Sequence, residues 1–144
     1  MSLTQAMAVN LSGIEAERIA LELIASNLAN INTTRTANGG PYRRKIPVFS
    51  EVSAPSFSDE LANAKRKVFG AGVEMTDIVE DTSPFPRVYN PGHPDADVSG
   101  FVRLPNVNLS KEMVDQIYAS RLYEANITAF NATKKMMQDT LQIQ

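Results

Sequence analysis

The sequence contains no cysteine and no tryptophan, and only one of its 144 residues is a histidine. The lack of cysteine excludes a disulfide framework, a thiol nucleophile and a thiolate-ligated metal. No segment approaches the roughly 20 consecutive apolar residues of a membrane-spanning helix. The N-terminal segment has no basic stretch, and Glu15 and Arg18 interrupt its apolar positions, so we expect no cleavable secretory signal.

An excess of charge of either sign is also lacking. The 14 Lys and Arg residues, set against 16 Asp and Glu residues, leave a net charge of −2. Such a balance gives the chain no overall attraction for nucleic acid or for anionic lipid. The length fits one domain, or one small domain with an accessory element.

Helix-breaking residues are almost absent from both ends of the chain. All eight prolines lie between Pro41 and Pro105, and six of the seven glycines lie between Gly39 and Gly100. Both residue types interrupt helices. The sequence therefore predicts an α+β fold, with a long helix at each end of the chain and a β-rich segment between them.

Apolar residues that recur every seven positions predict the first helix, from about Thr4 to Asn30. Ser2 and Gln5 have the spacing of a capping box at its start, and the asparagines at its end suit the left-handed conformation of a helix C-cap. Gly13 is a weak point that costs about 1 kcal/mol relative to alanine. The stripe expected to pack on the second helix and on other subunits is formed by Met7, Leu11, Ile14, Leu21, Ile24 and Leu28.

A sharper pattern predicts the second helix, which we expect to start at Ser110 with Glu112 and Asp115 in its first turns. Its apolar residues alternate by four and three positions, which is the spacing of a coiled-coil seam. The seam consists of Tyr118, Leu122, Ala125, Ala129, Ala132 and Met136. We expect it to pair with the stripe of the first helix as an antiparallel coiled coil.

The second helix has more apolar surface than one partner can cover. Residues such as Met113, Val114 and Ile117 lie outside the seam. Exposed apolar patches larger than roughly a few hundred Å² mark interaction sites, so we expect the leftover sides to pack on adjacent chains. The alternative is that both helices pack on the β-rich segment within one globule.

The middle of the chain predicts short strands bounded by turns. They are expected at Ile46–Phe49, Val73–Met75, Ile78–Val79, Arg87–Tyr89 and Phe101–Arg103. The stretch from Ser53 to Lys67 has weak strand character and is expected to form a loop or a short helix. We expect a helical core domain made of residues 1–33 and 108–144, with a β-rich domain inserted at residues 34–107.

No convincing active site is found. His93, Asp95 and Asp97 share a face of an extended segment and could ligate a metal, but a polar turn capped by the aspartates is the favoured interpretation. A Ser-His-Asp triad with this histidine lacks supporting context. The basic run at residues 43–45 either contacts an acidic partner or forms a solvated hairpin edge, and the second interpretation is favoured. We expect the carboxylates of the helices to face solvent, and we expect no catalytic residue, cofactor or metal.

The run at residues 26–34, SNLANINTT, resembles the signature of bacterial flagellar rod and hook proteins. Its signature residues are Ser26, Asn27, Asn30, Asn32 and Thr33. Further segments resemble the proximal rod members of this family and together span nearly the whole chain: 34–37, 39–44, 89–97, 100–107, 112–114 and 120–126. Phe101 stands where a tyrosine would be expected.

The resemblance implies a structural axial protein and not an enzyme. It also implies export by the flagellar type III apparatus without a cleaved signal, and assembly into the rod that crosses the periplasm as a drive shaft between the motor ring and the hook. The terminal helices would form an inner layer, and the β-rich insert a small outer domain. The implied partners are the rod proteins FlgB, FlgF and FlgG, the adaptor FliE, the MS ring and further copies of the chain in a helical assembly, without nucleic acid and without a membrane span.

Two other function classes stay open. A coiled-coil adaptor or export chaperone would share the two helices but should not need the β-rich insert. A small hydrolase would depend on His93.

Overall fold

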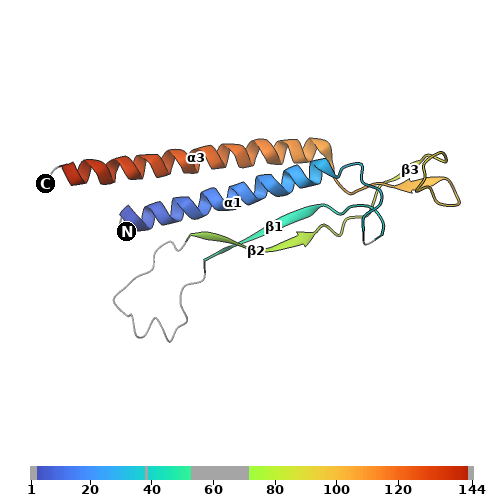
Figure 1. Ribbon diagram of the computed structural model, residues 1–144, viewed down its shortest axis with the longest axis horizontal. Coiled ribbons are helices and arrows are strands. Elements are labelled where there is room, and N and C mark those ends of the chain that lie inside the picture. Colours follow the sequence, from blue (N-terminus) through green and yellow to red (C-terminus); the bar gives the residue numbers. More distant parts are fainter. Residues whose placement is uncertain (1–2, 38, 53–71, 143–144) are drawn as a thin grey trace, which may run out of the picture.

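Two long helices lie side by side, and this arrangement confirms the predicted α+β fold. The computed structural model describes residues 3–37, 39–52 and 72–142. Helix α1 (Leu3–Ala29) and helix α3 (Leu109–Gln142) run antiparallel, so the start of α1 and the end of α3 lie at the same end of the molecule (Figure 1).

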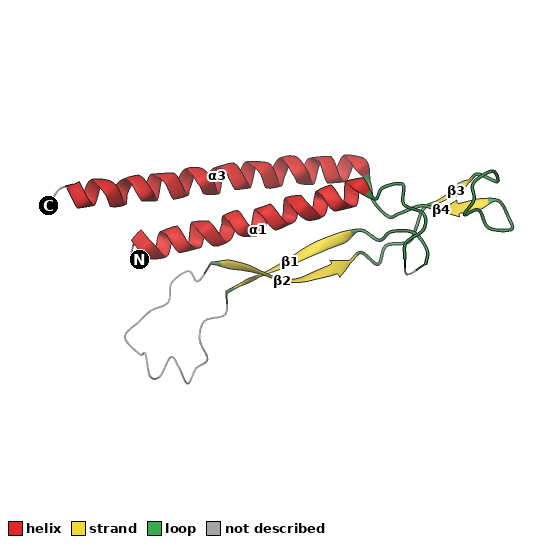
Figure 2. Cartoon of the chain, viewed as in Figure 1, coloured by secondary structure: helices red, strands yellow, loops and turns green. Residues whose placement is uncertain are grey.

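Two β-hairpins connect the helices. Strands β1 (Lys45–Glu51) and β2 (Val73–Glu80) form a long hairpin that lies along α1. Strands β3 (Arg87–Tyr89) and β4 (Phe101–Arg103) form a shorter hairpin with the bounds that the sequence predicts. This distal hairpin projects beyond the end of the helices where α1 stops and α3 starts (Figure 2).

Helix α3 is capped by Asn108, two residues before the start that the sequence predicts at Ser110. The Asn108 Oδ1 atom accepts a hydrogen bond from the backbone N–H of Lys111 at 3.1 Å. This bond satisfies one of the donors that the first turn of a helix leaves without an intrahelical partner. The helix accordingly begins at Leu109, one residue earlier than expected.

Helix α1 ends without the left-handed asparagine that the sequence predicts. Among the described residues, only glycines have a positive φ. Instead, Asn30 Nδ2 donates to the backbone carbonyl of Ser26 at 2.9 Å, and Asn30 Oδ1 accepts from the Thr33 hydroxyl at 3.1 Å. The side-chain amide thus satisfies a carbonyl at the helix end, which makes a left-handed residue unnecessary. At the other end of α1, Ser2 of the expected capping box lies outside the described residues.

Strands β1 and β2 pair in an antiparallel register with one irregularity. The two strands predicted between residues 73 and 79 form one continuous strand, and the register shifts between Val48 and Phe49. Thr76 is the extra residue of this bulge, and its hydroxyl donates to the Val48 carbonyl at 3.3 Å. The segment from Ser53 to Lys67, expected to be a loop or a short helix, lies outside the described residues.

The β1–β2 hairpin depends on α1, because a two-stranded sheet is marginal by itself. The Ser12 Oγ atom of α1 accepts a hydrogen bond from the backbone N–H of Val73 at 3.1 Å. Near the end of α1, Asn27 bonds both backbone groups of Lys45. The hairpin is therefore anchored to the helix at both of its ends. The division into a helical core and an inserted domain stays a prediction.

The apolar core is small and lies between the helices. Ala20 and Ile24 of α1 and Ala119 of α3 form it, with Leu21 and Leu28 packed against it. Neither described helix combines the length and apolar character that crossing a bilayer requires.

Candidate functional site

The two helices approach each other closely at Gly13 of α1. A Cβ atom added at Gly13 would lie 2.9 Å from the side-chain amide nitrogen of Asn126 in α3. Any larger residue at this position would displace Asn126 or separate the helices. The glycine that looks like a weak point in the sequence is therefore a close-approach position, and the packing offsets its helix-propensity cost of about 1 kcal/mol.

The predicted stripe of α1 is covered to different degrees. Ile24 is buried, whereas Leu11 is 49% exposed. The other four members are half-buried: Met7, Ile14, Leu21 and Leu28. In the single chain this stripe has remaining surface that a further partner could cover.

The face of α3 that meets α1 lies one position beyond the predicted seam. Ala119 is buried there at 4% exposure, and Asn126 lies opposite Gly13. In the predicted seam, Leu122 is half-buried and the other members are exposed: Tyr118, Ala125, Ala129, Ala132 and Met136. The residues that face α1 have the same four-and-three spacing as the predicted seam but are shifted by one position. They include polar residues such as Asn126, so a search for apolar residues at this spacing finds the seam and not the face that packs on α1. Most of the seam does not face α1 in the single chain, and its packing on neighbouring subunits stays a prediction.

Exposed apolar side chains cover the first turns of α3. The exposed fractions of Met113, Val114, Ile117 and Tyr118 are 50%, 65%, 62% and 66%. Residues three and four positions apart are neighbours on a helix surface, so these four form one apolar strip. Tyr118 also lines a groove of about 340 Å³ between α1, β1 and α3. The apolar strip is the candidate assembly surface of the chain.

A buried polar side chain joins the end of α1 to β1 and to α3. Asn27 is 1% exposed. Its Oδ1 atom accepts hydrogen bonds from the Tyr42 hydroxyl and the Lys45 backbone N–H, both at 2.9 Å. Its Nδ2 atom donates to the Lys45 carbonyl at 2.9 Å and to Glu112 Oε2 at 3.1 Å. One amide thus holds together three segments that are distant in the sequence.

Glu112 and Arg44 form the charged part of this cluster. Glu112 is fully buried and accepts a hydrogen bond from Arg44 Nε, while Arg44 Nη2 donates to Asp115 Oδ2 at 2.9 Å. The Arg44 backbone N–H donates to Asn106 Oδ1 at 2.8 Å. The expectation of solvated charges is wrong for Glu112 and Arg44, because each compensates the other in the interior. We call this cluster the polar junction, with the members Asn27, Tyr42, Arg44, Asn106, Glu112 and Asp115.

The segment around His93 forms a polar turn, which confirms the favoured interpretation. His93 Nδ1 accepts a hydrogen bond from the backbone N–H of Asp95 at 3.1 Å, and Asp95 Oδ2 accepts one from the Thr34 hydroxyl at 2.8 Å. Within the described residues, no three potential ligands come together as a metal site would require.

Backbone hydrogen bonds lower the pKa of Asp97, which caps the turn before β4. Asp97 Oδ1 accepts from the backbone N–H groups of Phe101 at 3.0 Å and Ser99 at 2.9 Å. The Phe101 bond is the largest cause of the lowered pKa, and the positive charges of Arg87 and Arg103 add to it. The carboxylate therefore has a structural role in the distal hairpin.

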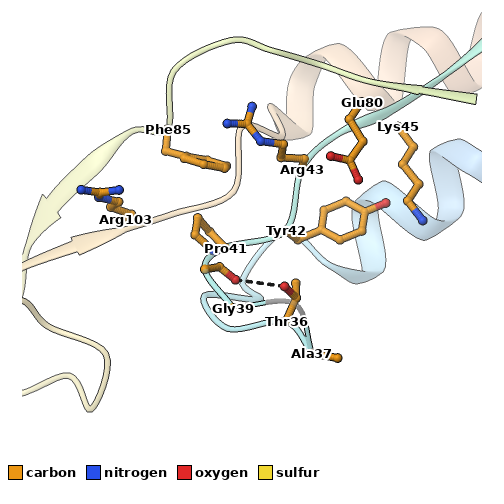
Figure 3. A pocket seen from close by; sticks show the side chains of 11 residues that line it. Thr36, Ala37, Gly39, Pro41, Tyr42, Arg43, Lys45, Glu80, Phe85 and Arg103 are labelled. Carbon is orange, nitrogen blue, oxygen red and sulfur yellow. Dashed lines mark hydrogen bonds between the residues drawn. The ribbon is translucent and has the colours of Figure 1, made fainter.

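A hollow of about 430 Å³ opens where the distal hairpin joins the rest of the chain (Figure 3). The guanidinium of Arg43 lies 4.4 Å from the centroid of the Phe85 ring, and its Nη1 atom donates to the Asp81 carbonyl at 2.9 Å. The described residues that line the hollow include no histidine and a single carboxylate, that of Glu80. This lining does not supply the paired groups of acid–base catalysis.

Comparisons with known proteins bear on both helices. A family model described as Flagella basal body rod protein matches residues 7–35, and one described as Flagellar basal body rod FlgEFG protein C-terminal matches residues 98–143. The flagellar basal-body rod protein FlgC of Bacillus subtilis is 42% identical over 99% of this chain and 99% of its own length. FlgC of Borreliella burgdorferi is 41% identical over 99% of this chain and 98% of its own. The chain belongs to the FlgC family of flagellar basal-body rod proteins.

FlgC of Aquifex aeolicus is 36% identical over 99% of this chain and 97% of its own length. Such full-length similarity confirms the resemblance drawn from the sequence motifs, and it identifies a structural rod protein. The two matched regions contain most of α1 and all of the described α3. The polar junction links these two regions of the FlgC fold through the hydrogen bond between Asn27 and Glu112.

The signature residues of this FlgC-family chain cluster at the end of α1. Asn27 is the centre of the polar junction, and Asn30 and Thr33 bond to each other beyond the last turn. The Ser26 hydroxyl lies 3.5 Å from the hydroxyl of the junction's tyrosine, and Asn32 is exposed. The signature therefore shapes the path by which the chain leaves α1.

Sequence reasoning missed the other members of the polar junction. One signal could have found Glu112, because it lies seven residues before Ala119 and so shares its side of α3. A carboxylate on the inner face of a helix indicates a buried cationic partner. The sequence offers no comparable signal for Arg44, whose neighbours in the chain are also basic.

Proposed function

We propose that this FlgC-family chain is a structural subunit of the proximal rod, which polymerises into the drive shaft that transmits torque from the motor ring to the hook. The observation that carries the proposal is the apolar strip of α3, whose members are at least half exposed. Apolar patches of this kind mark protein–protein contacts. Head-to-tail contacts that do not close on themselves generate a helical assembly.

The proposed neighbours are those of an axial rod component. They are the rod proteins FlgB, FlgF and FlgG, the adaptor FliE, the MS ring and further copies of this chain. The chain would be exported by the flagellar type III apparatus without a cleaved signal and would act in the periplasm. Residues 1–33 and 108–144 would form the inner helical layer, and residues 34–107 the outer part.

The proposal includes no catalytic role and no cofactor. The ring and carboxylates of the polar turn already bind backbone and hydroxyl groups, which supports a structural role for His93 and Asp95. The competing hydrolase would lose its activity in His93→Ala. We expect His93→Ala cells to swim normally, and a loss of cell-wall processing while the chain is still present in basal bodies would favour the hydrolase.

The second candidate is a coiled-coil adaptor or export chaperone, which the paired helices alone would favour. The anchoring of the β1–β2 hairpin to α1 at both ends speaks for the rod subunit, because an adaptor should not need this element. Analytical sedimentation separates the two functions. An adaptor forms a defined dimer, whereas a rod subunit is monomeric until it meets a template.

The direct test uses basal bodies isolated from cells that lack the gene for this chain. Without the chain, we expect MS rings that carry no rod and no hook. Expression of the intact chain should restore the rod, and the chain should then be found within isolated basal bodies. Normal rods in cells without the chain would contradict the proposal, as would a restored cell in which the chain stays in the cytoplasm.

A further inference from the structure

The exposed face of the distal hairpin combines two arginines with two aromatic rings. Arg87 pairs directly with Arg103 across the two strands, and Tyr89 pairs with Phe101. Because strand residues alternate between faces, these four side chains share one side of the hairpin. On the opposite side, Val102 is 2% exposed, whereas its cross-strand partner Val88 is 47% exposed. We call the side with the arginines and the rings the distal face, formed by Arg87, Tyr89, Phe101 and Arg103. Phe101 and Arg103 also line a hollow next to the segment 34–41.

The arginines of the distal face form no salt bridge within the part of the chain that the structure describes. Like charges that lie directly opposite each other destabilise a strand pair, yet neither Arg87 nor Arg103 has a carboxylate within salt-bridge distance among the described residues. Arg35, Asp95 and Asp97 line the same hollow as Arg103, and among the described residues Arg35 too has no carboxylate within salt-bridge distance. The nearby Asp97 uses its Oδ1 atom to hold the backbone of the turn. The Asp97 charge offsets part of the repulsion between Arg87 and Arg103. A carboxylate from another molecule would add the direct ion pair that the described residues do not supply.

The outward side of the β1–β2 hairpin has the complementary character. Pro47 and Phe49 line the groove against α1, together with Ile46 near the start of the strand. Further along the strand, the residues that alternate with Phe49, which are Val48 and Ser50, point to the other side. Their cross-strand partners are the exposed carboxylates Asp77 and Glu74. We call this side the outer face, formed by Val48, Ser50, Glu74, Asp77 and Val79. Its aliphatic side chains are also accessible, with Val48 39% and Val79 45% exposed.

These two faces do not meet within one chain. The β1–β2 hairpin lies along α1. The distal hairpin projects beyond the end of the helices at which α1 stops and α3 starts (Figure 1). A contact between them must therefore join two copies. Because the two faces differ, the contact is head-to-tail, and each copy keeps one face free for the next copy.

We propose that the distal face of one copy docks on the outer face of the next copy along the rod. Arg87 and Arg103 would bind the carboxylates of Glu74 and Asp77 through charge-assisted hydrogen bonds. The aromatic rings would cover the exposed valines, and Arg and Tyr are the residue types that dominate interface energies. This inference rests on the proposed rod function, since it describes how successive subunits meet.

The absence of cysteine from the chain permits a direct test by disulfide cross-linking. Tyr89→Cys on the distal face is combined with Val48→Cys on the outer face in one chain, and basal bodies containing it are isolated and oxidised. We expect a ladder of dimers, trimers and larger species, because every copy carries both faces. The matched control combines Val88→Cys, next to Tyr89 but on the other side of β3, with Val48→Cys. This control should give no ladder.

Charge reversal provides a second and independent test. The pair Arg87→Glu with Arg103→Glu should abolish swimming, and so should Glu74→Arg with Asp77→Arg. The chain with all four changes has both faces reversed, and it should swim again. Loss of function from misfolding alone would not be rescued by further substitutions.

The outcomes separate the two proposals. A ladder from the test pair, with rescue by the four changes, supports the docking. Basal bodies that contain the chain but give no ladder, or four changes without rescue, would overturn the docking and leave the rod function standing. Absence of the unaltered chain from basal bodies would overturn both.

Discussion

Glu112 and Arg44 are buried together at the point where α1, β1 and α3 meet. Removing two charges from water costs so much that well-packed apolar residues often give equal or greater stability. The pair instead fixes the relative positions of the three elements, because the Glu112 carboxylate accepts directional hydrogen bonds from both Arg44 and Asn27. We infer that the polar junction fixes the angle at which the hairpins leave the helices, which a purely apolar contact would leave adjustable.

Removal of one partner of this buried pair should be strongly destabilising. Glu112→Ala leaves the Arg44 guanidinium with Asp115 as its remaining carboxylate and removes one acceptor of Asn27 Nδ2. We expect the free energy of unfolding to fall by about 3 kcal/mol, the lower end of the cost of breaking a buried pair. Urea denaturation followed by tyrosine fluorescence measures this change. The control is Glu22→Ala, because Glu22 and its partner Arg18 are 62% and 60% exposed. Its effect should stay within about 0.5 kcal/mol, and equal effects of the two variants would refute the role of the junction.

The turn before β4 should depend on pH through Asp97. Its pKa is lowered from the ordinary value of 3.8, so the carboxylate supports the turn at every pH above that value. This support is lost as the pH falls through the lowered pKa. The backbone amide signal of Phe101, followed by NMR, should therefore shift at a pH below 3.8. In Asp97→Asn the amide oxygen can still accept the hydrogen bonds, and the shift should disappear; an unchanged titration would assign it to another group.

At the scale of elements, the sequence predicts the features that depend on neighbouring residues in the chain, which are the helix ends and the short strands. Both ends of α1 and the start of α3 are right to within one residue, because capping residues and apolar spacing act over one or two turns. The strands at 87–89 and 101–103 follow from β-forming residues between turns. The face of α3 that packs on α1 could not be predicted, because the residues of this face and those of the predicted seam have the same spacing and differ by one position. The partnership of Arg44 and Glu112 does not follow either, because it joins residues 68 positions apart.

The alanine seam of α3 provides a prediction about neighbouring subunits. Ala129 is exposed in the single chain, so Ala129→Glu should leave the monomer and its export intact. It should block rod assembly, because it would bury a charge between subunits. Ala119→Glu is the contrasting variant, since Ala119 is 4% exposed and its replacement should unfold the helix pair itself. Electron microscopy of basal bodies checks assembly, and normal rods with Ala129→Glu would remove the seam from the subunit contacts.

At the scale of the whole molecule, the helices have little to hold them in isolation. Along the described length of α3, the buried residues are Glu112 and Ala119, and both lie in its first third. Helices in proteins are stabilised mainly by packing of an apolar face. The later turns of α3, with Met136 and Leu141 exposed at 58% and 69%, therefore depend on contacts that other subunits would supply.

The isolated chain should accordingly be incompletely helical at low concentration. Amide hydrogens near the polar junction should exchange slowly, whereas those of α3 beyond Phe130 should exchange nearly as fast as in an unfolded chain, because local opening there exposes little buried surface. Circular dichroism should show less helix in the dilute monomer than in isolated rods. Because frayed helices do not present a continuous seam, the chain would not associate with other copies before export. Hydrogen exchange with uniform protection along α3, together with a single cooperative melting transition of the monomer, would contradict this view and would mean that the helix pair is self-sufficient.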